Sequence, residues 1–268
     1  MIPALLFFAV AADIEHAFER MYNFDFAEAH EALAGAIQEE PENPLPYSAR
    51  SAAHLFSELD RLGILQSEFF ATNKSIFNKK KRPDPDLTVK ARLQADVAKA
   101  HELADAQLAV DPNNANALFA MSMAWGISAD YAALVEKRHL GSLSIAKKSN
   151  HYANRLRKTS PEFYDALLTT GLSEYIVGSL PFFVRWFVKF DDVEGSKQRG
   201  VDQLEVVAQR GNLYRPFARI LLAIVHVREK RHADAYALLD GLSREFPENP
   251  LLRTEAARLL ERVEGAGR

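Results

Sequence analysis

The sequence predicts an all-α fold in which antiparallel helix pairs stack as an α-solenoid, with an irregular middle and a C-terminal capping helix. Two stretches share a phrase: residues 21–44 read MYNFDFAEAHEALAGAIQEEPENP, and residues 229–250 read EKRHADAYALLDGLSREFPENP. Each combines a polar turn, a helix with small residues at helical spacing, and a closing proline. Weaker copies end near Pro112 and Pro161. Such self-similarity is typical of repeat proteins, in which no single unit can bury its apolar face alone.

Composition limits the function classes. The chain has 268 residues, of which 48% are hydrophobic, so it is long and apolar enough for a sizeable core. The net charge of −3 gives no electrostatic reason to expect nucleic acid as a partner. The absence of cysteine excludes disulfides, thiol catalysis and thiolate zinc sites. We expect one helical repeat domain over residues 13–268.

The N-terminal segment, residues 1–12, has two interpretations. It reads MIPALLFFAVAA, which is uncharged and apolar, and Ala9-Val10-Ala11 has the small-x-small form that signal peptidases accept. The alternative is that the segment begins the first helix, since it is short and has no Lys or Arg before its apolar stretch. A signal peptide would imply a periplasmic or secreted protein; otherwise a cytoplasmic location is expected.

Helical periodicity runs through almost every segment, and no segment alternates as a β-strand would. In the N-terminal half, Pro44 suits a first helical turn, Gly63 suits a helix end, and the loop 78–86, NKKKRPDPD, interrupts the pattern. The helices expected in this half span residues 14–21, 27–39, 47–62, 64–77 and 87–110.

The C-terminal half continues in the same way, but with unequal spacing between its prolines. Its last helix is rich in Arg and Glu, as suits the polar cap of a solenoid. The helices expected here span residues 116–127, 131–140 continuing to 157, 163–177, 182–190, 197–208, 216–228, 233–245 and 251–262.

The repeated phrase resembles the tetratricopeptide repeat, or TPR, a helix-turn-helix unit of about 34 residues. In that family small residues stand where the two helices touch, so that the helix axes approach closely. His232 stands where an aromatic residue is usual, and Leu242 replaces a small one. The residues that match the family pattern are Phe26, Ala29, Leu33, Ala36 and Pro41 in the first unit, and Ala235, Leu239 and Pro247 in the last.

The middle of the chain departs from this pattern. Residues 171–195, GLSEYIVGSLPFFVRWFVKFDDVEG, are not TPR-like and are similar to a segment of uncharacterised bacterial TPR-containing proteins. That similarity implies no activity.

Known catalytic and cofactor motifs are absent from the sequence. It contains neither G-x-x-x-x-G-K-[ST] nor G-x-G-x-x-G, and no serine stands in G-x-S-x-G. His30 and His101 are each followed by Glu, but Ala34 and Asp105 stand where a second metal-binding histidine would be needed. Acidic neighbours such as Glu58 and Asp60 are typical of solvated faces. We therefore expect no enzyme, no catalytic residue, no metal and no cofactor.

Two local features have more than one interpretation. The basic run 79–82 suits a nucleic-acid or lipid contact, but a solvated loop is favoured. The aromatic segment 182–190, FFVRWFVKF, suits an interfacial helix or a partner-binding knob, but a plug buried between repeats is favoured.

The resemblance to TPR arrays implies a binding groove, because the first helix of each unit lines a concave surface in that family. We expect a non-catalytic scaffold that binds a protein or peptide there, or a groove filled by the chain's own aromatic segment. The groove is apolar, which suits an amphipathic helix better than a peptide carboxylate. The alternatives are a membrane-associated adaptor using 182–190, and a small-ligand binder or enzyme with a site between helices. The candidate groove residues are Asn116, Phe119 and Met123 in one unit, Asp165, Leu168, Leu172 and Tyr175 in a second, and Phe217, Ile220 and Ile224 in a third.

Overall fold

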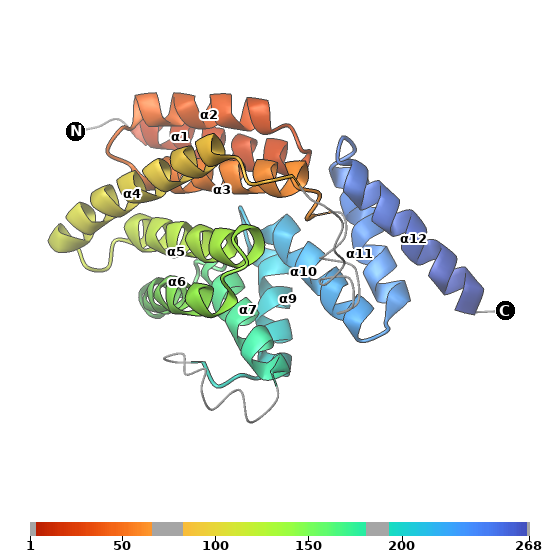
Figure 1. The fold of residues 1–268 in the computed structure, drawn as a ribbon. Helices are drawn as coiled ribbons and strands as arrows, with labels where there is room; N and C mark the ends of the chain where they lie inside the picture. Colours follow the sequence, from red (N-terminus) through yellow and green to blue (C-terminus); the bar gives the residue numbers. More distant parts are fainter. Residues whose placement is uncertain (1–3, 66–82, 181–192, 267–268) are drawn as a thin grey trace.

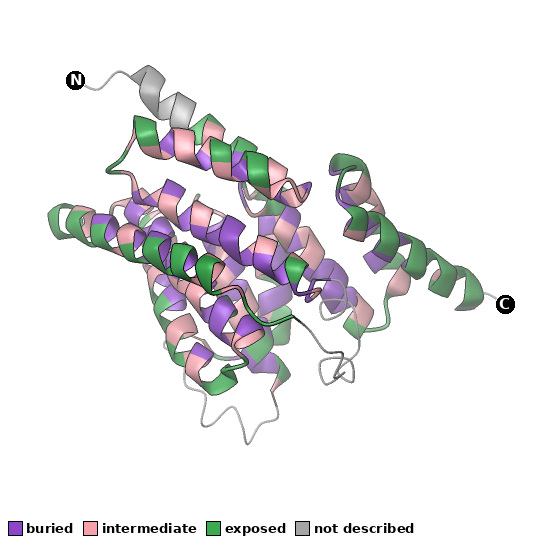
Figure 2. Cartoon of the chain, turned by 45° about the horizontal axis from the view of Figure 1, so that its top comes forward, coloured by how far each residue is buried: buried purple, intermediate pink, exposed green. Residues whose placement is uncertain are grey.

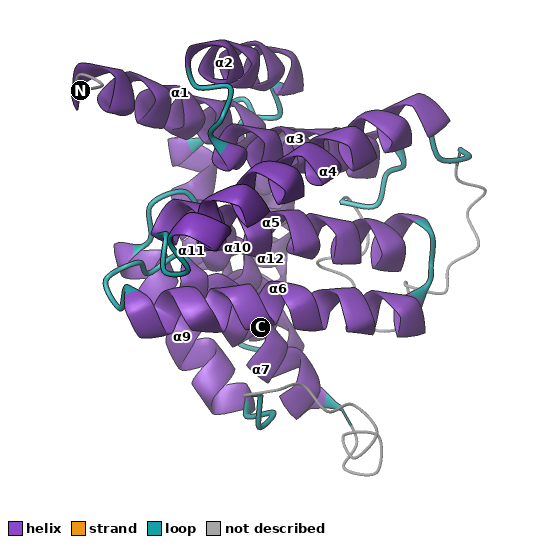
Figure 3. Cartoon of the chain, turned by 90° about the vertical axis from the view of Figure 1, so that its left-hand side faces the viewer, coloured by secondary structure: helices purple, strands orange, loops and turns teal. Residues whose placement is uncertain are grey.

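The computed structural model describes residues 4–65, 83–180 and 193–266. Within these ranges the regular secondary structure is eleven α-helices and one short π-helix, η1, without a β-strand (Figures 1 and 3). In chain order the helices are α1 (Ala4–Tyr22), α2 (Phe26–Glu39), α3 (Pro44–Arg61), α4 (Leu87–Val110), α5 (Ala115–Asp130), η1 (Tyr131–Val135), α6 (His139–Thr159), α7 (Ala166–Ser179), α9 (Lys197–Arg210), α10 (Arg215–Arg228), α11 (His232–Glu245) and α12 (Pro250–Ala266).

Consecutive helices pack against each other in pairs. The contacts join α1 with α2, α3 with α4, α5 with α6, α7 with α9, and α11 with both α10 and α12. Further contacts of α5 with α3 and α4 connect the pairs into one body. The predicted all-helical fold of consecutive pairs is therefore confirmed. Most described helix bounds lie close to the expected ones, but α1 begins at Ala4, ten residues before the expected start at residue 14. The expected helices 64–77 and 182–190 fall largely or wholly outside the described residues.

The shared phrase PENPL folds into the same turn twice. Asn43 Oδ1 accepts a hydrogen bond from the backbone N–H of Leu45 at 3.0 Å, and Asn249 Oδ1 accepts one from Leu251 at 2.9 Å. The carbonyl of the first proline also accepts a side-chain donor six residues later in both copies, from Tyr47 in one and Arg253 in the other. Each asparagine thus satisfies an N–H group that the start of a helix leaves without an intrahelical partner.

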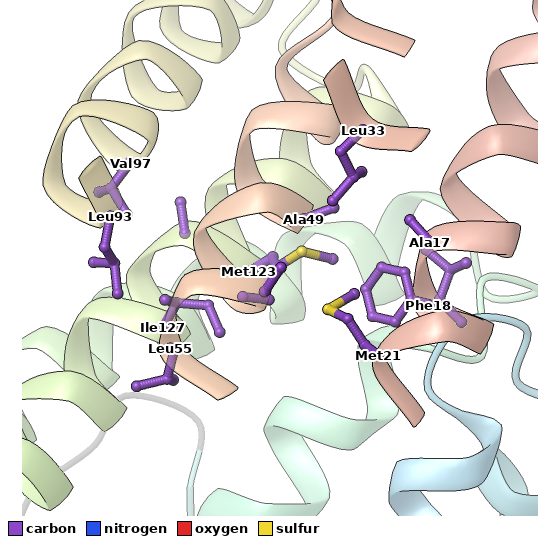
Figure 4. Packing of buried hydrophobic residues seen from close by; sticks show 14 of the residues in the cluster. Ala17, Phe18, Met21, Leu33, Ala49, Leu55, Leu93, Val97, Met123 and Ile127 are labelled. Carbon is purple, nitrogen blue, oxygen red and sulfur yellow. The ribbon is translucent and has the colours of Figure 1, made fainter. Parts of the chain in front are cut away.

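Small and aliphatic residues are buried where the repeat pattern predicts helix contacts. Ala29, Leu33 and Ala36 of α2 are completely inaccessible, and so are Ala235 and Leu239 of α11. Around them, the largest core cluster joins α1 to α6, and Figure 4 shows part of it between α1, α3, α4 and α5. In Figure 2 the outer faces of α4 and α12 carry exposed residues, whereas α5 is mostly buried. The core is thus centred on α3 and α5.

By length and composition alone, the segment Ala115–Val135 could cross a membrane, since its mean hydropathy is 1.3. No other helix among the described residues meets that test. However, 67% of its apolar window is buried inside the protein. The central place of α5 in the core explains this apolar composition.

The prediction of a continuous helix over residues 131–157 is wrong. The backbone instead forms the π-helix Tyr131–Val135, then breaks before α6 begins at His139. Lys137 adopts a positive φ of 58°, a conformation that ends a helix, and the N–H of Arg138 donates back to the carbonyl of Ala132. The break was missed because a lysine, not a glycine, occupies the left-handed position.

The two ends of the helical array contact each other. Asn249, just before α12, donates from Nδ2 to the carbonyl of Tyr22 at 2.7 Å, and the rings of Tyr22 and Phe246 lie 5.3 Å apart. Arg20 forms an ion pair with Glu248 at 2.7 Å, and Asn23 Oδ1 accepts from the N–H of the same Glu248. The end of α1 and the turn between α11 and α12 therefore close the array on one side.

Candidate ligand cavity

A cavity of about 430 Å³ lies among α1, α3, α5, α6, α7, α10 and the start of α12. Its walls are mainly apolar. Phe18 and Met21 of α1 face Met123 of α5, as Figure 4 shows, and all three line the cavity. Six aromatic side chains contribute to the lining: Phe18, Tyr22, Phe24, Phe56, Tyr214 and Phe217.

Most polar groups of the lining are satisfied by the fold itself. The hydroxyls of Ser122 and Ser149 each donate to the backbone carbonyl of the other, at 3.2 and 2.7 Å, and thereby join α5 to α6. Ser142 donates to the carbonyl of His139, and Asn249 is used by the turn before α12. These groups are structural, so they offer little to a ligand.

Asp130, the last residue of α5, has no such partner within the described ranges. Among the described residues, nothing donates a hydrogen bond to its carboxylate or forms an ion pair with it. The carboxylate can be reached by water, yet many protein atoms surround it, and this burial raises its pKa to about 7. Asp130 is the one carboxylate among the described lining residues, which include neither Lys nor Arg.

Tyr214 lies at the start of α10 and presents its ring to the same cavity. The ring packs edge-on against Phe18, with centroids 6.0 Å apart, and against Phe119 at 5.5 Å. Burial raises the pKa of Tyr214, and the nearby carboxylates of Asp165 and Asp130 raise it further. Its hydroxyl is therefore neutral at pH 7 and can both donate and accept.

The candidate groove residues fall into three places. Met123, Leu168, Leu172, Phe217 and Ile220 line this cavity. Tyr175 and Ile224 are buried in the cluster between α7, α9 and α10.

Asn116 and Phe119 line a second, smaller cavity of about 280 Å³, and Asn116 Nδ2 donates to Asn43 Oδ1 at 2.9 Å. Asp165, also a groove candidate, is buried and accepts backbone hydrogen bonds from Asn212, Leu213 and Tyr214. It therefore has a structural role in the turn before α10.

Asp130 was missed by the sequence analysis, although a signal for it exists. Met123, Gly126, Ile127 and Asp130 follow the i, i+3, i+4, i+7 spacing of one helix face, and all four line the cavity. One of these, Met123, was a candidate. Asp130 lies seven residues after Met123 on that face, so the same spacing indicates it.

The histidines do not form a metal site in the part of the chain that the structure describes, where no group of three His, Asp or Glu side chains could hold an ion. The rings of His30 and His54 pack in a tilted arrangement with centroids 4.3 Å apart. Asp96 accepts two hydrogen bonds from Arg50, at 2.6 and 2.9 Å, and lies 3.5 Å from His54 Nε2. This cluster joins α2, α3 and α4. The segments 79–82 and 182–190 lie outside the described residues.

No protein-family model, no curated protein and no solved structure matches this chain. Its function is therefore argued from the geometry of the cavity.

Proposed function

We propose that this is a non-catalytic binding protein on a TPR-like helical-repeat scaffold, and that its cavity holds the apolar part of a small amphiphilic ligand. The observation that carries the proposal is the cavity itself, about 430 Å³ in volume and walled by aromatic, aliphatic and methionine side chains. Binding sites for small molecules typically have such a volume, a mostly apolar lining and a few unengaged polar groups. Here Asp130 and Tyr214 are such groups.

The TPR-like scaffold is supported by two local features. The PENPL turn has the same hydrogen bonds at both ends of the chain. Alanines at the predicted helix contacts, such as Ala29 and Ala235, are completely buried. The closure between α1 and the α11–α12 turn makes the inner surface a walled cavity, which suits a small ligand.

The proposed non-catalytic role is supported by how three serine hydroxyls of the cavity are used. Ser122, Ser142 and Ser149 donate to backbone carbonyls. A nucleophilic serine would instead donate to a neighbouring base held by a third group.

A protein or peptide partner is the second candidate, and the rim of the cavity favours it. Ile176 lines the cavity and is 46% exposed, and Leu140, beside the lining residue His139, is 86% exposed. An amphipathic helix could cover these side chains and insert one apolar residue.

A periplasmic or secreted location and a membrane-adaptor role of segment 182–190 stay predictions.

A neutral fluorescent probe tests the proposed function. N-phenyl-1-naphthylamine, added to the full chain, is expected to bind with increased emission. Leu172→Trp fills the cavity and should weaken binding by at least about tenfold, which corresponds to 1.4 kcal/mol. Val110→Trp, a matched control at a position that is 88% exposed and outside the cavity, should leave binding unchanged. Failure of the wild-type protein to bind, or equal binding by both variants, would reject the proposal.

A further inference from the structure

Asp130 is an exposed residue at the edge of a largely apolar cavity, and no described residue pairs with its carboxylate. The surrounding walls are apolar, and no Lys or Arg stands among the described residues that line the cavity. The apolar walls reduce the hydration of this carboxylate without supplying a partner, so it stays available to a ligand. An accessible and unpaired carboxylate beside an apolar cavity is a candidate for binding a ligand of opposite charge.

The aromatic walls favour the same charge. The faces of aromatic rings carry negative potential and attract cations within about 6 Å of the ring centre. Six aromatic residues line the cavity, and two of them, Tyr214 and Phe18, pack edge-on against each other. A cation that lies over the face of one of these rings would gain from the ring as well as from the carboxylate, whereas an anion would be repelled by both.

The neutral hydroxyl of Tyr214 adds a third contribution. Its oxygen can accept a hydrogen bond from an ammonium group, and among the described residues it has no partner of its own. Ammonium has several donors, so a head group paired with the carboxylate keeps further N–H groups for other acceptors of the lining.

We infer that the ligand of this cavity is an amphiphile with a cationic amine head, which pairs with Asp130 and lies among the aromatic side chains while its hydrocarbon part fills the apolar remainder. The inference rests on the proposed binding function. It adds the charge and class of the head group, which the apolar walls by themselves leave open.

Three ligands with one hydrocarbon chain test the head group: decylamine, decanol and decanoate, each below its micelle concentration and measured by calorimetry with the full chain. Decylamine should bind at least about tenfold more tightly than decanol, the ratio that one charge-assisted hydrogen bond supplies. Decanoate should bind most weakly of the three.

The Asp130→Asn variant tests binding of the head group independently of binding of the hydrocarbon chain. It should lose most of the preference for decylamine over decanol and keep its affinity for decanol. Asp105→Asn, which changes an exposed carboxylate of α4 outside the cavity, should keep the preference.

The outcomes distinguish the two proposals. If none of the three ligands binds, the proposed function fails and the inference with it. If decanol and decylamine bind equally, or if Asp130→Asn keeps the preference for the amine, the inference alone is overturned.

Discussion

The carboxylate of Asp165 accepts a hydrogen bond from the backbone N–H of Leu213 at 3.1 Å, although the two residues are 48 positions apart. The carbonyl of the same Leu213 accepts a hydrogen bond from the hydroxyl of Tyr22 at 2.8 Å. The N–H groups of Asn212 and Tyr214 also donate to Asp165. This carboxylate therefore organises the turn that carries Tyr214 into the cavity, and through Leu213 it connects α7 to α1.

Replacing Asp165 with alanine should destabilise the protein by about 2–4 kcal/mol, because three backbone donors would lose their acceptor in a largely buried turn. Urea unfolding followed by circular dichroism measures this loss. Asp105→Ala, at an exposed position of α4, provides the control and should change stability by less than about 0.5 kcal/mol. A similar stability for both variants would contradict the structural role of Asp165.

The helix bounds were predictable wherever side-chain caps and prolines stand in the sequence. Asp86 accepts hydrogen bonds from the N–H groups of Thr88 and Val89 and so caps α4. In the structure α4 spans Leu87–Val110, the bounds expected from the sequence. The break at Lys137 was not predictable in this way, because the left-handed position is occupied by a lysine, whose side chain gives no signal for a positive φ.

The candidate site was predictable only in part, for a physical reason. Helix periodicity places Met123, Leu172 and Phe217 on inward faces, and these three do line the cavity. It contains no information on contacts such as that of Tyr22 with Asn249, which are 227 positions apart and close the array. The contribution of α1 and the unpaired state of Asp130 follow from such distant contacts.

Replacing Gly200 with alanine should destabilise the contact between α7 and α9. A Cβ at Gly200 would lie 2.7 Å from the carbonyl oxygen of Gly171 and 2.7 Å from the backbone nitrogen of Tyr175, so the two helices would have to move apart. We expect a loss of about 1–3 kcal/mol, as is usual for overpacking, measured by urea unfolding.

Gly35→Ala in α2 is the matched control for this substitution. Its Cβ would find no atom closer than 4.0 Å. Alanine favours a helix over glycine, so this variant should gain about 0.5–1 kcal/mol. Stabilisation by Gly200→Ala would show that α7 and α9 do not pack as closely as described.

Asn249→Ala should cost more than the loss of a helix cap. Asn249 caps α12 through the N–H groups of Leu251 and Leu252 and also donates to the carbonyl of Tyr22. Asn114 is a suitable comparison, since its side chain accepts from Ala117 as the cap of α5. We expect a loss of about 1 kcal/mol for Asn114→Ala and about 2–3 kcal/mol for Asn249→Ala.

Hydrogen exchange locates the additional loss in the Asn249 variant. Amide protection near the C-terminal end of α1 should fall in Asn249→Ala and stay unchanged in Asn114→Ala. Equal protection of α1 in both variants would mean that closure of the array does not depend on Asn249.

Asp130 should make the unliganded protein less stable as the pH rises. Burial raises its pKa from 3.8 in the unfolded chain to about 7, so the folded state binds a proton more tightly than the unfolded state. Its contribution to stability is therefore largest below pH 4 and is lost as the pH rises towards 7. Thermal unfolding should show Asp130→Asn stabilised relative to wild type at pH 8 and not at pH 4; an equal shift at both would contradict this assignment.

His30 should produce the opposite pH dependence. Burial, followed by the nearby charges of His54, Arg50 and Arg92, lowers its pKa from 6.5 to about 4, while Asp96 opposes the shift. The folded state therefore disfavours the protonated ring, so the stability present above pH 6.5 is lost as the pH falls towards 4. The loss amounts to at most about 3 kcal/mol. His30→Gln, which cannot take up this proton, should lose less stability than wild type between pH 7 and pH 4.5 in urea unfolding. Parallel losses in the two proteins would show that His30 is not the group responsible.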